Sequence, residues 1–411
     1  MTAEQTRKVI VNRKNICYNI FIVESLEKER DMMTVITERE RYIKTLTFGN
    51  PDKIPLNPGG PRESTILRWR SEGLVEGMDP LRFIYETLGI DRGATGGDTH
   101  GFFLNTKMNP MFEEKVLKHE NDHYIVRDWM GAVVEISDAF DVTYLRSAKD
   151  FVTRKWHKFP VETREDWERM RTRYDANDIS RMPENLREIA DQINGRDFPL
   201  SVSINGPFWQ LREWMGMENL CVAFLDEPEF VGEMIEFWCG FVARLLEKSL
   251  SVVRVDRVQI SEDMAYKAHS MISPQLTRRF LQPVYEKWAA VLRACKVPVI
   301  DMDSDGFVED LIPVWIDSGI SACNPIEAAA HNDIVKYRRM FGQSMAYSGG
   351  IDKRAIAAGG ETMKAEVMRV VPPLLAGGGF IPGCDHGVPP DISLHNFMEY
   401  TELLAHLTGW L

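Results

Sequence analysis

Short apolar segments recur along the second half of the chain, and each is followed by a longer segment with helical spacing of its apolar positions. The apolar segments are 199–204, 256–260, 297–302, 319–323, 344–348 and 379–383. The helical spacing is clearest between Phe280 and Leu292, where every fourth residue is apolar. Pro283 predicts a kink in that helix. Strands that alternate with helices predict a parallel sheet with helical crossovers.

The number of strands predicts how the sheet closes. An apolar strand at 53–57 and one further strand before residue 120 bring the total to that of a (β/α)8 TIM barrel. An open, doubly wound sheet is the alternative fold, but no GxGxxG or GxxxxGK[ST] motif follows any of the predicted strands. In a parallel barrel, the residues directly after each strand line the pocket.

The first half of the chain is less regular. Residues 1–35 have no clear periodicity and are predicted to be an N-terminal extension, before a helix that begins at the capping-box sequence TERE, residues 37–40. Residues 36–411 are predicted to form a single barrel domain. Within it, residues 121–140 alternate as a β-hairpin does, and residues 141–196 are charged enough to predict an exposed helical insertion.

The composition excludes several classes of protein. With 411 residues and a net charge of −12, the chain carries no basic block for sequence-independent binding of nucleic acid. The six cysteines are scattered without a CxxC motif, which indicates reduced thiols. The apolar stretch 16–23 is too short to cross a bilayer and lacks a signal-peptide cleavage site. These features predict a cytoplasmic protein without a membrane partner.

Polar residues follow the predicted strands at one end of the sheet. In chain order they include Asn205, Trp209, Glu262, Tyr266, Asp301, Asp303, Asp305, Cys323, Tyr347, Cys384, Asp385 and His386. Taken singly, each aspartate is as compatible with a helix cap or a turn as with a site. Alternate residues of an extended chain face the same side, so Asp303 and Asp305 are predicted to point together into the barrel mouth.

Several of these segments resemble the uroporphyrinogen decarboxylase superfamily. They occur in the family's order over about residues 36 to 411 and include NGPFWQLREWMGMENL, ISEDMAYKAHSMISP, IDMDSDGFVEDLIPVWIDSGI, YSGGIDKRAIAAG and GGFIPGCDHGVPPDISLHNF. The resemblance implies a (β/α)8 barrel with its cleft at the carboxyl ends of the strands. The histidine of the family's G-H-G motif maps onto His386.

The superfamily contains decarboxylases and corrinoid-dependent methyltransferases. Decarboxylases typically carry R-Q-A-G-R-Y after the first strand, where this chain reads PGGPRE and keeps Arg62 but loses the arginine pair. A porphyrinogen with several carboxylates needs such charge-assisted donors, so the change favours the methyltransferase branch. A uroporphyrinogen-type decarboxylase is the alternative function. A non-catalytic binding protein, such as a corrinoid-protein chaperone, is a third hypothesis.

The methyltransferase branch often holds zinc with H-x-C-G and a distant P-G-C. Here Asp303-Ser304-Asp305-Gly306 replaces H-x-C-G, and Cys384 keeps the P-G-C. Carboxylate ligands make a harder centre, which suits an ether oxygen better than a thiol. The resemblance therefore implies O-demethylation, in which a methyl group passes from a small methoxylated, aromatic substrate to the cob(I)alamin of a separate corrinoid protein.

The ether oxygen must be protonated or bound to a Lewis acid as the methyl group leaves. The predicted ligands of a zinc ion are Glu262, Asp303, Asp305 and Cys384, and the predicted catalytic residues are His386, Asp385 and Asp303. The predicted substrate-binding residues are Asn205, Trp209, Tyr266, Tyr347 and Arg68. The corrinoid protein is expected to dock over the rim 205–214, 262–269 and 384–390, with Trp209 and Trp214 as apolar contacts. A homodimer is left open.

Overall fold

The computed structural model describes residues 36–91, 100–139 and 154–411. The chain divides into two compact units, residues 1–37 and residues 38–411, and the fold described here is that of the second unit. None of the helices in the described ranges is long and apolar enough to span a membrane.

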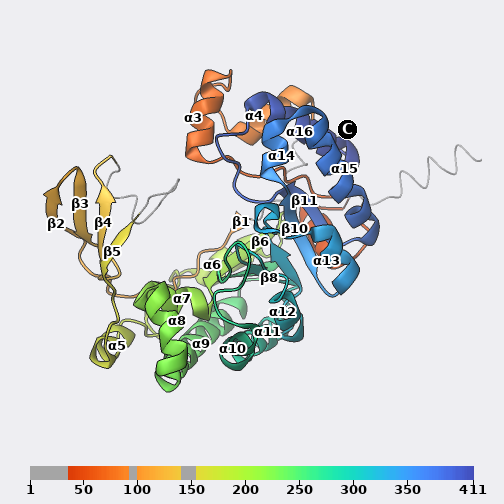
Figure 1. The fold of residues 1–411 in the computed structure, drawn as a ribbon. Coiled ribbons are helices and arrows are strands. Elements are labelled where there is room, and N and C mark those ends of the chain that lie inside the picture. The colour runs from red at the N-terminus through yellow and green to blue at the C-terminus, as the bar shows by residue number, and fades with distance from the viewer. Residues whose placement is uncertain (1–35, 92–99, 140–153) are drawn as a thin grey trace, which may run out of the picture. The chain divides into compact units, whose positions relative to one another are not determined.

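The main sheet of this unit is parallel. Its described strands form a seven-stranded sheet in the order β1-β6-β7-β8-β9-β10-β11 (Figure 1). They are β1 (His100–Gly101), β6 (Leu200–Asn205), β7 (Arg257–Ser261), β8 (Val299–Asp303), β9 (Ala322–Asn324), β10 (Ala346–Ile351) and β11 (Phe380–Cys384). The six strands predicted from residue 199 onward are confirmed, and β1 supplies the short strand expected before residue 120.

The strand predicted at 53–57 is wrong. Instead, the segment 57–62 runs beside the end of β11, where Cys384 N donates to Pro58 O (3.1 Å) and Val388 N donates to Gly60 O (2.9 Å). The chain approaches β11 closely because Gly383 has no side chain: a Cβ there would lie 2.5 Å from Asn57 O. Prolines remove N–H donors that a regular strand would need. The described residues therefore show an α/β fold with a curled parallel sheet, and not a complete eight-stranded barrel.

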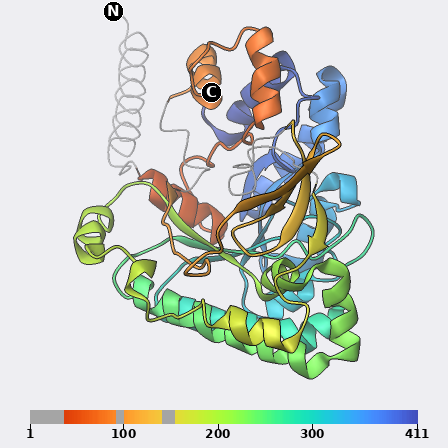
Figure 2. The same ribbon diagram turned by 90° about the vertical axis from the view of Figure 1, so that its left-hand side faces the viewer.

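Helices pack around the outside of this sheet (Figures 1 and 2). They are α2 (Glu38–Leu46), α3 (Glu63–Ser71), α4 (Pro80–Leu88), α7 (Pro207–Met215), α8 (Met217–Asp226), α9 (Pro228–Leu250), α10 (Pro274–Leu276), α11 (Gln282–Ala294), α12 (Ile312–Asp317), α13 (Ile334–Phe341), α14 (Lys353–Ala358), α15 (Gly360–Gly377) and α16 (Leu394–Thr408). The long helix α9 packs against α11, and Trp238 and Trp288 on these helices are fully buried. The helix predicted to begin at residues 37–40 is confirmed as α2, and the helical spacing noted between Phe280 and Leu292 corresponds to α11 and the turn before it.

The kink predicted at Pro283 takes the form of a π-helical turn, Thr277–Leu281, between α10 and α11. Proline has no N–H, and its ring collides with the carbonyl group four residues earlier in a regular helix. A wider turn relieves that collision.

The chain between the first and second strands of the main sheet forms a separate antiparallel sheet. Its described strands have the order β2 (Lys115–Glu120), β3 (His123–Arg127), β4 (Val133–Ser137) and β5 (Lys155–Lys158). The hairpin predicted over 121–140 is confirmed as β3 and β4, whereas the insertion predicted to be helical is only partly so. Its helices are α5 (Arg164–Arg171) and α6 (Leu186–Ile193), but β5 is a strand because Trp156 packs against the apolar face of β3 and β4. Residues 140–153 of that insertion lie outside the described residues.

Candidate functional site

A cavity of about 490 Å³ opens at the carboxyl ends of the main strands. Among the described residues, its polar lining consists of three carboxylates, one imidazole, three amides and two hydroxyl groups, and no arginine or lysine. These residues are Asp263, Asp303, Asp305, His386, Asn57, Asn205, Asn324, Ser261 and Ser348. Trp209 and Cys384 complete the chemically distinctive part of the wall. The cavity is therefore polar and acidic.

Six of the predicted site residues line this cavity, namely Asn205, Trp209, Asp303, Asp305, Cys384 and His386. Parallel pairing explains part of this arrangement, because Asp303 pairs with Ser261 of β7 on one side and with Asn324 of β9 on the other. Residues at the same level of adjacent strands reach the same end of the sheet.

Two predicted residues are buried beneath the site without lining it. Glu262 is fully buried, and its carboxylate accepts hydrogen bonds from Trp209 N (2.8 Å) and from the hydroxyl group of Tyr285. Burial raises the pKa of Glu262 to about 7. Asp385 is also fully buried, and its carboxylate accepts from Ala328 N (2.9 Å) and Lys353 N (3.2 Å). Both carboxylates hold backbone in place.

Three predicted substrate-binding residues also lie outside the described lining. Tyr347 is fully buried and has the guanidinium of Arg338 over its ring at 5.1 Å, because its neighbour Ser348 takes the cavity-facing position on β10. Tyr266 is 60% exposed. Arg68 on α3 pairs with Glu72 (2.6 Å) and donates to Pro390 O (2.5 Å).

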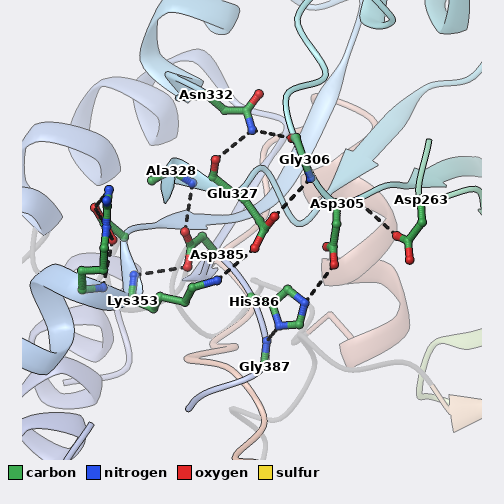
Figure 3. A network of polar contacts seen from close by, with 12 residues as sticks. Asp263, Asp305, Gly306, Glu327, Ala328, Asn332, Lys353, Asp385, His386 and Gly387 are labelled. Atoms are coloured by element: carbon green, nitrogen blue, oxygen red, sulfur yellow. Dashed lines mark hydrogen bonds and ion pairs between the residues drawn. The ribbon is translucent and has the colours of Figure 1, made fainter. Parts of the chain in front are cut away.

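His386 has hydrogen-bond partners on both ring nitrogens (Figure 3). Its Nε2 lies 3.1 Å from Asp305 Oδ2. Its Nδ1 lies 2.7 Å from Gly387 N and 2.9 Å from Arg62 Nη2. The hydrogen bond with Asp305 raises the pKa of His386, and burial together with the charges of Lys353 and Arg62 opposes that rise.

Among the carboxyl groups that line the cavity, Asp303 has the most strongly shifted pKa. Burial raises its pKa to about 6, and the negative charges of Asp263, Asp301 and Asp305 act in the same direction. The hydroxyl group of Ser261, which donates to Asp303 Oδ2 at 2.9 Å, opposes the rise. Burial and Asp305 also raise the pKa of Asp263. The cavity therefore holds a carboxyl group that exchanges its proton near neutral pH.

A second polar network ties together the loops after the strands (Figure 3). Lys353 Nζ lies 2.9 Å from Glu327 Oε1, and Gly306 N donates to Glu327 Oε2 at 3.1 Å. Asn332 Nδ2 donates to Gly306 O and to Glu327 O, each at 2.8 Å. These contacts hold the loops that follow β8, β9 and β10 against one another.

Sequence reasoning missed Arg62, Asp263, Glu327 and Lys353 as members of the site. Asp263 and Glu327 do lie in segments that follow predicted strands, so their positions carried a usable signal. Arg62, which precedes α3, and Lys353, the first residue of α14, lie outside those segments and reach the site with their long side chains.

The described residues contain a group that could be expected to hold a metal ion. The ligand atoms of Asp305, Glu327 and His386 lie within 4.8 Å of one another. However, Glu327 is paired with the cation Lys353, and Nδ1 of His386 already accepts a backbone N–H. A neutral imidazole in this arrangement carries its proton on Nε2, the nitrogen that faces Asp305.

The predicted zinc ligands do not fit a zinc site either. The carboxylate oxygens of Glu262 are occupied by Trp209 N and the Tyr285 hydroxyl. Burial raises the pKa of Cys384 to about 12, so a zinc ion would have to displace a firmly held proton before it could bind this sulfur as a thiolate. The donor set of the described site therefore favours proton transfer over metal binding.

Elemental analysis should accordingly find far less than one zinc ion per chain in the purified protein. Replacing Cys384 by serine should leave that content unchanged, as should the same replacement at Cys323, a buried thiol that does not line the cavity. A stoichiometric zinc content that Cys384→Ser abolishes and Cys323→Ser preserves would restore the metal centre.

Comparison with known proteins supports the fold and identifies the family. The sequence profile of the uroporphyrinogen decarboxylase (URO-D) family matches residues 152–406. A methyltransferase from Methanosarcina mazei superposes with a TM-score of 0.53 at 14% identity, covering 90% of this chain and 99% of that chain, which supports the fold alone. No curated protein matches the chain.

Two further structures are more distant. A B12-independent methionine synthase from Shewanella sp. W3-18-1 has a TM-score of 0.34 at 10% identity, covering 54% of this chain and 66% of that chain. A putative vitamin-B12-independent methionine synthase from Listeria monocytogenes has a TM-score of 0.33 at 9% identity, covering 56% and 69%. The family match spans more than half of the chain, and with the strand-end cavity it identifies the protein as a member of the URO-D family.

Proposed function

We propose that this chain is a corrinoid-dependent methyltransferase that removes a methyl group from a small methoxylated substrate. The observation that carries the proposal is the acidic cavity of about 490 Å³, in which the pKa of the lining residue Asp303 is raised to about 6. That volume is typical of sites for small organic ligands. The Methanosarcina mazei neighbour, described as a methyltransferase, is consistent with this choice.

The charge of the cavity argues against the alternative, a decarboxylase of uroporphyrinogen type. The described lining presents Asp263, Asp303 and Asp305 without any arginine or lysine. Substrate carboxylates would be repelled by these groups and would find few charge-assisted donors. Arg62, which stands where the family's arginine motif occurs, is directed at His386.

The chemistry requires an acid. The bond between the methyl carbon and the ether oxygen breaks, the oxygen keeps the electron pair, and the oxygen must then gain a proton. Cob(I)alamin on a partner protein would supply the electron pair for the new bond to the methyl carbon. Asp303 would supply the proton. Trp209 would contact the organic group that carries the methoxy substituent, and Asn205 and Asn324 would bind its polar substituents.

The partner would dock where the cavity opens, over the rim 205–214, 262–269 and 384–390. One expected contact is wrong: Trp214 is fully buried, packs at a tilt against Trp167, and is not available to a partner. Tyr266, which is 60% exposed, offers an aromatic side chain of this rim to a partner.

The proposal is tested by mixing the protein with a reduced corrinoid protein and matched methyl ethers while the cobalt spectrum is recorded. We expect methylation of the cobalt, with 2-methoxyphenol preferred over 2-methoxybenzoate by about tenfold or more, since one unfavourable charge contact costs about 1.4 kcal/mol. 1,2-Dimethoxybenzene, which has neither a hydroxyl group nor a charge, is the control for size.

Two other results would contradict the proposal. Absence of methyl transfer from every ether, together with decarboxylation of uroporphyrinogen, would assign the chain to the decarboxylases. Inactivity in both assays would favour a non-catalytic binding protein.

A further inference from the structure

The segment before α3 places one arginine against His386. Arg62 N donates to Val388 O (3.1 Å), and the hydroxyl group of Thr65 donates to the same carbonyl (2.7 Å). Val388 N in turn donates to Gly60 O (2.9 Å). The backbone of Arg62 is thus tied to the loop that carries His386, and its side chain reaches back to that histidine.

The contacts of His386 determine which nitrogen carries the proton. Gly387 N and Arg62 Nη2 lie 2.7 and 2.9 Å from Nδ1, and both groups are hydrogen-bond donors only. Nδ1 must therefore act as an acceptor. The ring proton then sits on Nε2, where it is donated to Asp305 Oδ2 at 3.1 Å.

Charged groups on five different segments face this histidine. Asp305 after β8, Asp263 after β7 and Glu327 after β9 favour a second proton on the ring, whereas Lys353 at the start of α14 and Arg62 before α3 oppose it. The hydrogen bond with Asp305 outweighs the opposing effects and raises the pKa of His386. In the neutral ring the proton stays on Nε2, because a proton on Nδ1 would have to displace both Arg62 and the Gly387 N–H.

We infer that Arg62 is a positioning residue that holds the neutral His386 in the Nε2–H tautomer, so that the histidine donates to Asp305. If the proposed function holds, His386 then orients Asp305, and Asp303 is left as the acid that protonates the leaving oxygen. The tautomer itself does not depend on the proposed function.

The tautomer is read from the ¹⁵N spectrum of the full chain labelled at histidine, with His386 assigned by its loss in His386→Asn. At about pH 9, where the ring is neutral, we expect a protonated Nε2 and an unprotonated Nδ1. In Arg62→Gln, which keeps a neutral donor but removes a charge that opposes ring protonation, we expect the titration of His386 to move to higher pH. Arg70→Gln, at an exposed position of the following helix α3, should leave the His386 signals unchanged.

Activity gives a second readout that a purely structural role would not produce. An imidazolium beside Asp305 would weaken the negative field that raises the pKa of Asp303. The fall of kcat/KM at high pH should therefore begin at lower pH in Arg62→Gln, and Arg62→Lys, which restores the charge, should partly reverse this shift.

Two results would overturn the inference: a proton on Nδ1 of the neutral ring in the wild-type protein, or an unchanged His386 titration in folded Arg62→Gln. The first result is measured on the wild-type protein. The inference can therefore be refuted even if Arg62→Gln does not fold. If the wild-type tautomer is as expected while no ether is demethylated, the proposed function fails and the positioning role of Arg62 stands.

Discussion

Replacing Asp303 by asparagine is expected to lower the rate of methyl transfer by about 10²–10⁴-fold, the usual contribution of a positioned general acid. Asparagine keeps the shape of the side chain and an oxygen that can accept from Ser261, so the cavity should persist. The rate is measured from the cobalt spectrum under single-turnover conditions, in which binding and product release do not limit it. Asp310→Asn, at an exposed position of the same loop, is the matched control and should be nearly as active as the wild type.

The pH dependence should have a defined sign. The protonated form of Asp303 is the reactive one, and its pKa is raised to about 6, so kcat/KM should fall as pH rises through about 6. Asp303→Asn should abolish this fall. A wild-type profile that is flat between pH 5 and 8, or a variant that keeps most of its activity, would remove Asp303 from the mechanism.

The same substitution should stabilise the fold at neutral pH. The folded pKa of Asp303 is raised from 3.8 to about 6, so ionisation of this group destabilises the folded state as pH rises from about 4 to above 6. Asp303→Asn should therefore raise the free energy of unfolding above pH 6 by roughly 2–3 kcal/mol, allowing for solvent screening. Below about pH 4 the difference should disappear. Urea titrations at both pH values test this.

The largest expected loss of stability comes from Asp256, at the opposite ends of the strands from the cavity. Its carboxylate accepts from Arg39 Nε (2.9 Å), from Leu200 N (2.9 Å) and from Arg196. The side chains of Arg196 and Asp256 are only 2% and 1% exposed. Asp256→Ala would leave a buried guanidinium without its partner, which typically costs about 3–5 kcal/mol.

Chemical denaturation measures that loss. Asp317→Ala is the matched control, because Asp317 pairs with Arg278 at 2.8 Å where the two side chains are about half exposed, and such surface pairs contribute less than about 1 kcal/mol. The fraction of Asp256→Ala that folds should keep wild-type kcat. A cost as small as that of Asp317→Ala would show that Arg196 finds another partner.

The regular part of the fold could be predicted from the sequence because strands of a covered parallel sheet are buried on both faces and appear as continuous apolar segments. The strand predicted at 53–57 does not form, because Pro55 lacks the N–H that a regular strand would use for a hydrogen bond to its neighbour. Tyr347 shows that the sequence did not determine which of two neighbouring residues of β10 faces the cavity. Ser348 faces it, whereas Tyr347 is directed at Arg338.

The polar part of the site was only partly predictable. Asp303, Asp305 and His386 follow predicted strands. The backbone of the parallel sheet therefore brings them to one edge, independently of their side-chain contacts. The contact between Arg62 and His386 joins residues 324 positions apart, and no local pattern reports it. Glu262 also follows a strand, but its carboxylate turns into the interior towards Tyr285, which lies on α11.

Segment 57–62 pairs with the loop after β11, and this pairing determines at which stage of synthesis and folding the site can be completed. The Arg62 side chain is made before its partners His386, Gly387 and Val388, which follow at least 324 positions later in the sequence. Contacts between such distant residues form slowly, because a long loop must close first. A nascent chain that has not yet reached β11 lacks the histidine that contacts Asp305, so the site can be completed only after that strand and the loop behind it have been made.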